Sequence, residues 1–130
     1  MTRFRCGERH LRVLTLVGKR WTLPILATLL DGPARFSELG RCVPGLSDRV
    51  MSERLQELCE AGVVERLVEP GPPLATKYRL TVAGEHLRPA LQHLLEAALA
   101  IPELDDAIYD LFVQFRDAGP RTRRRRLLSL

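Results

Sequence analysis

Aromatic residues are scarce in this 130-residue sequence, where they make up 5% of the chain. Hydrophobic residues as a whole reach 45%, which is enough to bury a core and excludes a disordered chain. The core must therefore consist mainly of Leu, Val, Ala and Ile, and the abundance of leucine favours helices. The length is that of one domain.

The sequence also lacks the marks of a secreted, metal-binding or membrane protein. Its three cysteines are an odd number and no Cys-x-x-Cys occurs, which argues against a disulfide framework. The three histidines form no standard zinc pattern. No N-terminal apolar run resembles a signal peptide, and no apolar stretch is long enough to span a bilayer. We therefore expect a soluble, cytoplasmic protein with no metal, no cofactor and no membrane partner.

Catalytic motifs are missing as well. There is no nucleophile with a base at useful spacing, no glycine-rich loop that would cradle a phosphate, and no pair of carboxylates in an evident cleft. We therefore do not expect an enzyme.

Positive charge is distributed unevenly along the chain, although the net charge is only +4. Residues 1–54 carry ten basic and five acidic groups, a balance of +5, whereas residues 55–120 carry five basic and eleven acidic groups, a balance of −6. Five arginines lie in 121–126. Because attraction to phosphate acts locally, the basic N-terminal half is the better evidence for a nucleic-acid partner.

The periodicity of apolar residues predicts a mainly α fold with a small β-hairpin (α+β). Strands are expected at 63–70 and 75–81. Helices are expected at 8–17, 20–30, 38–43, 47–61, 82–100 and 103–117.

Local signals predict where several of these helices begin. Thr22 is expected to cap the second helix, with Pro24 in its first turn. Phe36 is expected in a short extended bridge, and Ser37 is expected to cap the helix that follows. Pro89 is expected to kink the long helix at 82–100, or to cause a local adjustment there.

The helix predicted at 47–61 has two faces. Ser47 or Asp48 caps its start and Gly62 ends it. Its buried stripe contains Met51, Leu55 and Leu58, and its outward stripe contains Arg49, Ser52, Glu53 and Gln56. A short helix, a turn and a second helix that displays such groups can place the second helix in the major groove of DNA. The simpler interpretation is a solvated amphipathic helix.

The hairpin after this helix is expected to act as a wing. Lys77 and Arg79 share one face of its second strand and could reach an adjacent groove or the DNA backbone.

Several motifs together resemble HxlR-type winged helix-turn-helix regulators, which are relatives of the MarR type. The resemblance covers about residues 8–100. Its motifs are Gly-Lys-Arg-Trp at 18–21, Asp-Gly-Pro at 31–33, Arg-Phe-Ser-Glu-Leu at 35–39, Pro-Gly-Leu-Ser at 44–47, Arg-Leu-Gln-Glu-Leu at 54–58, Gly-Val-Val-Glu-Arg at 62–66 and "YRLTVAGEHLRPAL" at 78–91.

The resemblance implies a sequence-specific DNA-binding transcriptional regulator, a homodimeric repressor that reads a palindromic operator. The single domain would span 1–118, with a winged helix-turn-helix core at 19–81 and dimerisation helices at 8–17 and 82–117. The Arg-rich tail at 119–130 is expected to be disordered. The recognition helix would lie at 47–61 and the wing at 63–81. The residues expected to bind DNA are Arg35, Ser47, Asp48, Arg49, Ser52, Glu53, Gln56, Lys77 and Arg79.

A second interpretation stays open, in which the winged helix binds a protein or a ligand and binds DNA only weakly. The acidic segment 55–117 and the additional helix at 103–117, which many relatives lack, motivate this alternative.

A small molecule or an oxidant is a possible effector. Some HxlR-type relatives sense oxidants with a cysteine ahead of the first helix, and Cys6 lies there, among Arg3, Arg5 and Arg9. Nearby cations favour the reactive thiolate, so Cys6 is a candidate redox sensor; the alternative is an inert cysteine.

The other cysteines and the single tryptophan are expected to be structural. Cys42 is expected to pack in the core and Cys59 to be half-buried. Trp21 is expected to fill the core or to line an effector pocket.

Overall fold

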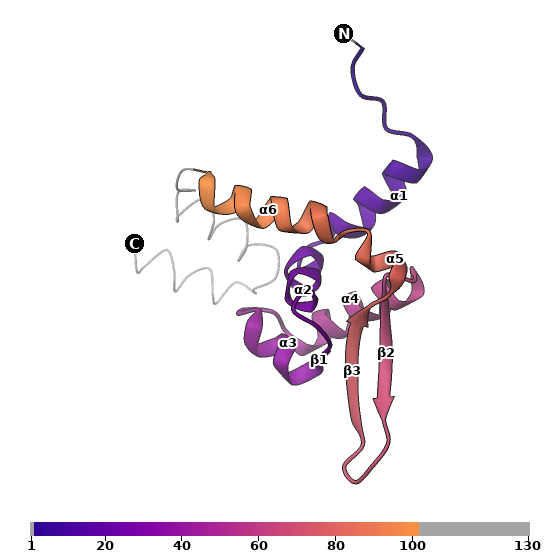
Figure 1. Cartoon of the computed structure of the whole chain (residues 1–130), viewed down its shortest axis with the longest axis vertical. Helices are drawn as coiled ribbons and strands as arrows, with labels where there is room; N and C mark the ends of the chain where they lie inside the picture. Colours follow the sequence, from indigo (N-terminus) through magenta and orange to yellow (C-terminus); the bar gives the residue numbers. More distant parts are fainter. Residues whose placement is uncertain (1, 102–130) are drawn as a thin grey trace. The chain divides into compact units, whose positions relative to one another are not determined.

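The computed structural model describes residues 2–101, and the chain divides into two compact units at 1–93 and 94–130. The elements, labelled in Figure 1, are α1 (Glu8–Val17), α2 (Thr22–Leu29), β1 (Ala34–Arg35), α3 (Phe36–Cys42), α4 (Asp48–Glu60), β2 (Val64–Glu69), β3 (Ala75–Leu80), α5 (Val82–Glu85) and α6 (Arg88–Ala100). The helix expected at 103–117 and the tail at 119–130 lie outside the described residues. None of the helices between residues 2 and 101 has the length and the hydropathy needed to cross a membrane.

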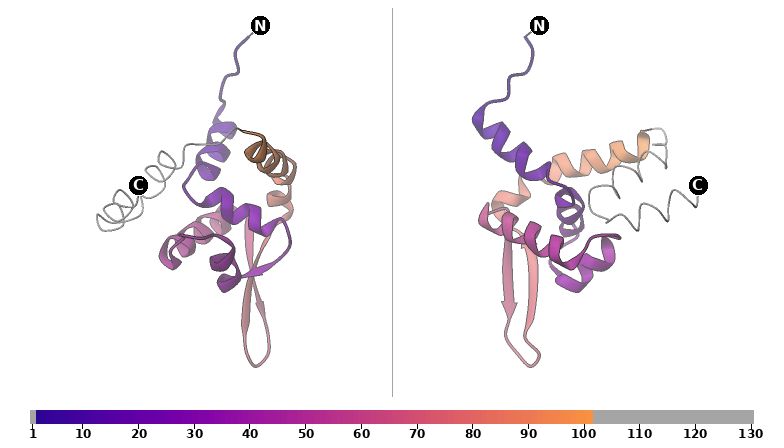
Figure 2. Two further views of the ribbon diagram at one scale, coloured as in Figure 1. Left: turned by 90° about the vertical axis from the view of Figure 1, so that its left-hand side faces the viewer. Right: turned by 180° about the vertical axis from the view of Figure 1, so that it is seen from behind.

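The predicted fold class is confirmed: the protein is mainly helical with a small antiparallel sheet. The β2–β3 hairpin, in which Val64 pairs with Leu80 and Arg66 with Tyr78, projects away from α2, α3 and α4 (Figure 2). The sheet has a third strand, because β1 pairs with β3 and gives the order β1-β3-β2. The sequence predicted a short extended bridge at Phe36, next to this strand, but not the strand pairing.

The prediction for Phe36 and Ser37 was wrong by two residues. The extended residues are Ala34 and Arg35, because both pair with β3, and Phe36 already begins α3. The backbone N–H of Arg35 donates to the Glu38 carboxylate at 3.3 Å. Glu38 therefore satisfies the start of α3 from inside its first turn, and Ser37 is not the cap.

The predicted limits of α4 are confirmed. The Ser47 hydroxyl accepts a hydrogen bond from the Val50 N–H at 3.2 Å, so Ser47 is the N-cap. The helix ends at Glu60, and Gly62, which follows the C-cap residue Ala61, has a φ of +76°, the left-handed conformation that glycine tolerates best.

The core of the first unit lies where α2, α3 and α4 pack on one another and on the sheet. Its fully buried side chains are Ile25, Leu26, Leu29, Leu39, Met51, Leu55, Leu58, Val64 and Thr22. Burial of an aliphatic side chain of this size contributes about 1.5–3 kcal/mol. Met51, Leu55 and Leu58 therefore anchor α4 firmly to the domain.

Thr22 does not cap α2, contrary to the prediction. Thr22 is the first residue of the helix and is buried, and the residue before it, Trp21, has a φ of +75°. Trp21 is half-buried against the core and lies beside Gly45, so tertiary packing sets this uncommon backbone conformation. Pro24 lies in the first turn of α2 as expected.

The long helix expected at 82–100 is divided into two helices. α5 ends at Glu85 and α6 begins at Arg88, so the break lies just before Pro89. Proline lacks the N–H that would continue the helix from α5. Arg88 braces the break: its guanidinium donates to the Glu85 carboxylate at 2.6 Å and to the Leu30 carbonyl at 2.9 Å. The hydrogen bonds from Arg88 hold the pKa of the Glu85 carboxyl below its usual value.

Candidate nucleic-acid interface

The outward face of α4 carries the polar stripe that the sequence predicted. Arg49, Ser52, Glu53 and Gln56 are exposed, while the opposite face of the helix is buried in the core. Ser47 and Asp48 are exposed at the start of the same helix, where the acidic charge of Asp48 suits the helix dipole. One exposed surface therefore contains all six residues that the sequence placed in a recognition helix.

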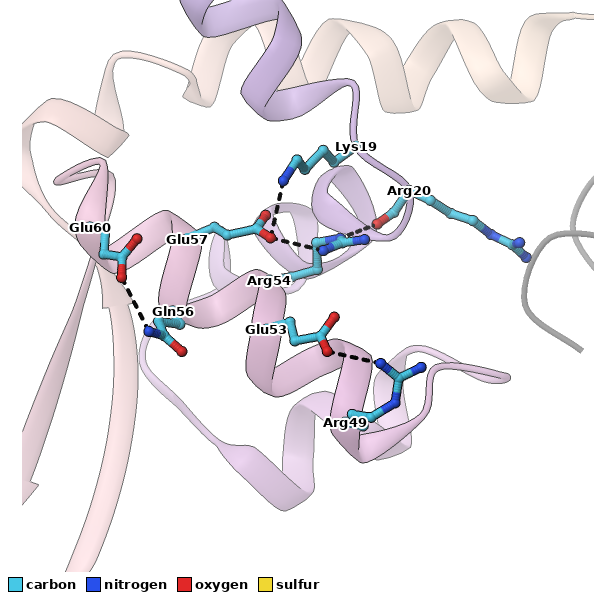
Figure 3. A network of polar contacts seen from close by, with 8 residues as sticks. All are labelled: Lys19, Arg20, Arg49, Glu53, Arg54, Gln56, Glu57 and Glu60. Carbon is cyan, nitrogen blue, oxygen red and sulfur yellow. Dashed lines mark hydrogen bonds and ion pairs between the residues drawn. The ribbon is translucent and has the colours of Figure 1, made fainter.

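Two side-chain pairs occupy this stripe in the DNA-free protein (Figure 3). Arg49 Nη1 lies 2.9 Å from Glu53 Oε1, and Gln56 Nε2 donates to Glu60 Oε1 at 3.1 Å. Exposed pairs at this spacing contribute about 0.3–0.5 kcal/mol. A bidentate contact to a base is worth about 1–3 kcal/mol of discrimination. The pairs are therefore weak enough to be exchanged for base contacts.

A second polar network, which the sequence did not predict, fixes α4 to the connection between α1 and α2 (Figure 3). Arg54 Nε donates to the Arg20 carbonyl at 2.8 Å, and Arg54 Nη1 lies 3.0 Å from Glu57 Oε1. Lys19 Nζ lies 3.1 Å from the same Glu57 oxygen. Arg54 and Glu57 are three positions apart on α4, but Arg20 lies 34 positions before Arg54 and Lys19 lies 38 positions before Glu57. Helical spacing alone could not predict these two longer-range contacts.

The basic residues predicted for the wing lie on one face of β3, and both have an acidic partner on β2. Lys77 Nζ lies 3.1 Å from Glu69, and Arg79 forms an ion pair with Glu65. Arg35 is exposed on β1 and pairs in register with Lys77, so β1 brings a further predicted DNA-binding cation to this sheet. The acidic partners reduce the net positive charge of the hairpin.

A hollow lies between α4 and the hairpin. Its volume is about 530 Å³, and it is lined by Ser52, Gln56, Cys59, Val64, Glu65, Arg66 and Tyr78. Arg66 and Tyr78 were not predicted as site residues. The sequence feature that could have predicted Arg66 is the alternation of side chains along β2, which places Arg66 on the same strand face as buried Val64.

The cysteines differ from the prediction at one position. Cys42 is exposed, not packed in the core, because Leu39 occupies the buried position of α3 and Cys42 is the last residue of that helix. Cys59 is half-buried as expected. Burial raises the pKa of the Cys59 thiol, although the nearby Arg66 guanidinium acts in the opposite direction. Cys6 is exposed.

Residues 2–101 contain no group of three or more His, Cys, Asp or Glu side chains placed to hold a metal ion.

A helix, a turn and a second helix with an exposed polar stripe, followed by a hairpin, define a winged helix-turn-helix protein. The chain belongs to the HxlR-like helix-turn-helix family, whose family model matches residues 16–103. The resemblance predicted from the motifs is therefore confirmed, and the protein is a DNA-binding transcriptional regulator.

Named relatives share this description. The HTH-type transcriptional regulator YvaP of Bacillus subtilis is 45% identical over 83 residues, which cover 64% of this chain and 77% of YvaP. The regulator YodB of the same organism is 40% identical over 80 residues, which cover 62% of this chain and 71% of YodB.

Solved structures show the same fold. Diamide-treated YodB superposes with a TM-score of 0.65 at 34% identity and covers 78% of this chain and 100% of that one. The redox regulator HypR in its oxidized form has a TM-score of 0.68 at 28% identity and covers 72% of this chain and 96% of that one.

Proposed function

We propose that the protein is a homodimeric repressor that reads a palindromic operator, with α4 in the major groove and the β2–β3 hairpin as a wing. The exposed stripe of α4 carries this proposal. Arg49 would bind guanine, Gln56 would bind adenine, and Ser52 and Glu53 would contact base edges or, for Ser52, a phosphate. Ser47 and the N-terminus of α4 favour contact with a backbone phosphate. The carboxylate of Asp48 would repel a phosphate and is better suited to accept a hydrogen bond from a base.

The hairpin and β1 supply the remaining proposed contacts. Arg35, Lys77 and Arg79 lie on one small sheet, and each would approach the DNA backbone or an adjacent groove. Lys77 and Arg79 would first have to leave Glu69 and Glu65, which costs little for exposed pairs.

Exposed apolar side chains support the proposed homodimer. None of the residues of α1 is buried, and Leu11, Val13 and Leu14 are 45–57% exposed. In α6, Leu94, Leu95 and Leu99 are exposed as well. Apolar surface of this kind on two helices is typical of a subunit interface. A symmetric dimer would place two copies of α4 about 34 Å apart, one turn of DNA.

We propose an oxidant as the first effector class to test, with Cys6 as the reacting thiol. Cys6 is exposed and lies ahead of α1, one of the two proposed dimerisation helices. YodB has been solved in a diamide-treated and a reduced form, and HypR in an oxidized and a reduced form. A small-molecule effector is the alternative. Oxidation of Cys6 to a sulfenic acid or to an intersubunit disulfide would alter the proposed interface and hence the spacing of the two α4 helices.

The same interpretation makes the protein a cytoplasmic one that acts by binding and not by catalysis, without a metal or a cofactor. The competing function is a winged helix that binds a protein or a ligand and holds DNA weakly, which the acidic segment 55–117 favours.

DNA binding at two salt concentrations, with and without a thiol oxidant, tests the proposal. The probe is the upstream region of the protein's own gene. Tight binding that weakens steeply with salt is expected, because phosphate contacts release counterions. Loss of binding on oxidation, with binding retained in Cys6→Ser, would establish Cys6 as the sensor. Indifference to oxidant would remove Cys6 and turn the search to small molecules. A flat salt dependence would favour the protein- or ligand-binding alternative.

A further inference from the structure

The hollow between α4 and the hairpin has a chemical character of its own. It combines two polar side chains of α4, Ser52 and Gln56, with Arg66 of β2 and Tyr78 of β3. Arg66 and Tyr78 are cross-strand partners in the register of the hairpin, so their side chains emerge side by side on the strand face of Val64. The hollow therefore gathers a guanidinium, a phenol, a hydroxyl and an amide.

Arg66 has no ion-pair partner among residues 2–101, which distinguishes it from the other cations of the hairpin. Lys77 and Arg79 are bound to Glu69 and Glu65. Glu65 also lines the hollow, but its carboxylate is occupied by Arg79. The charge of Arg66 reaches the neighbouring Cys59 thiol, on which it acts against the effect of burial. Among residues 2–101, the positive charge of Arg66 thus faces a hollow whose lining carboxylate, Glu65, is paired with Arg79 instead.

The geometry of DNA determines what would lie in this hollow if α4 reads a major groove. A helix in the major groove and a hairpin that reaches the adjacent groove must straddle the sugar-phosphate strand that separates the two grooves. That strand would pass between α4 and the hairpin, which is where the hollow lies.

We infer that the hollow is the seat of a DNA backbone phosphate, held by Arg66 and Tyr78 from the hairpin and by Ser52 or Gln56 from α4. This inference rests on the proposed function, and it adds two contact residues that read no sequence. Arginine matches phosphate oxygens bidentately, and the phenol and the hydroxyl are further donors. A phosphate held in this way fixes the register of α4 on the duplex, while the stripe of α4 provides the discrimination between bases.

The test is the salt dependence of DNA binding by Arg66→Ala, measured on the operator and on unrelated DNA. Each lost phosphate contact lowers the slope of log affinity against log salt by about 0.9, hence by about 1.8 for the two sites of a dimer. Between 50 and 200 mM salt, the wild type should therefore lose about tenfold more affinity than Arg66→Ala. The loss at a fixed salt concentration should be similar on both DNAs.

Two further variants separate the contact from a folding defect. Arg66→Lys keeps the charge, so the wild-type slope should return. Tyr78→Phe keeps the packing of the ring and removes a neutral donor, so it should weaken binding a few-fold with an unchanged slope. Thermal unfolding of each variant confirms that the domain is intact.

The outcomes separate this inference from the proposed function. If the wild type binds the operator steeply with salt and Arg66→Ala keeps the same slope, the phosphate seat is wrong and the DNA-binding proposal stands. If Arg66→Ala loses affinity on the operator alone, Arg66 reads a base, and the seat is again wrong. A wild type that binds no DNA overturns both.

Discussion

At the scale of the residue, Cys59 shows how burial decides chemistry that the sequence leaves open. Its thiol lines the hollow between α4 and the hairpin, whereas Cys6 and Cys42 are exposed. Burial raises the pKa of the Cys59 thiol, which lowers the thiolate fraction at neutral pH.

We predict that Cys59 is the slowest of the three cysteines to be alkylated at pH 7. Its alkylation rate should continue to rise as the pH passes the usual range of thiol pKa values. Mass spectrometry of the native protein during iodoacetamide treatment measures the three rates separately. In urea the three rates should converge, because the effect belongs to the fold. Alkylation of native Cys59 as fast as Cys42 would contradict the account.

At the scale of the element, the start of α5 depends on one close approach. A Cβ on Gly84 would lie 2.1 Å from the carbonyl oxygen of Val63, which belongs to the backbone and cannot rotate away. The Thr81 hydroxyl caps α5 by accepting from the Gly84 N–H at 3.0 Å, and it also donates to the Gly62 carbonyl. The start of α5 is thus fixed to the end of α4.

Gly84→Ala is therefore expected to lower the free energy of unfolding by about 1–3 kcal/mol, the usual cost of overpacking. Gly40→Ala is the matched control, because a Cβ there would meet only Met51 Cε at an ordinary 3.8 Å. Within α3 that change should stabilise the protein by about 0.5–1 kcal/mol. Urea unfolding measures the free energy of unfolding of both variants. An equal change in the two variants would show that the close approach to Val63 does not affect stability.

The elements also show which parts of the fold a sequence can predict. The limits of α4 depend on Ser47 and Gly62, which act on their own helix, and both were predicted. The strand β1 exists because of Tyr78 and Lys77, more than 40 positions away, and the sequence placed the extended bridge at Phe36, which instead begins α3. The left-handed Trp21 and the break braced by Arg88 likewise depend on distant partners.

The candidate site divides in the same way. The stripe of α4 follows from helical spacing, so its exposure was predicted residue by residue. The hollow requires α4 and two strands to be placed together, so Arg66 and Tyr78 were missed.

At the scale of the whole molecule, the proposed dimer is the feature on which operator reading depends. Leu14 on α1 is 54% exposed. This apolar side chain therefore faces water unless a second subunit covers it. A charge at this position would be buried without a partner in the dimer, which is costly.

We predict that the wild type has a solution mass of twice the 14.7 kDa of the chain, and that Leu14→Glu shifts it toward the monomer and weakens operator binding. Leu74→Glu adds the same charge between β2 and β3, at a position that is 73% exposed and lies outside both proposed dimerisation segments, and it should remain dimeric. Light scattering coupled to size exclusion measures both variants. A monomeric wild type, or an unchanged dimer in Leu14→Glu, would contradict the proposed role of α1.

The central claim is that the outward stripe of α4 reads bases, and Arg49→Ala tests it most directly. Within residues 2–101 of the DNA-free protein, the Arg49 guanidinium forms its ion pair with the exposed Glu53, so its loss should change the free energy of unfolding by less than about 0.5 kcal/mol. Fluorescence anisotropy with the operator and with unrelated DNA gives the two affinities. We expect Arg49→Ala to weaken operator binding by about 1–3 kcal/mol and to reduce the preference over unrelated DNA, as the loss of a bidentate base contact requires. An unchanged operator affinity would contradict base reading by Arg49, and an equal loss on both DNAs would reduce its role to that of a phosphate contact.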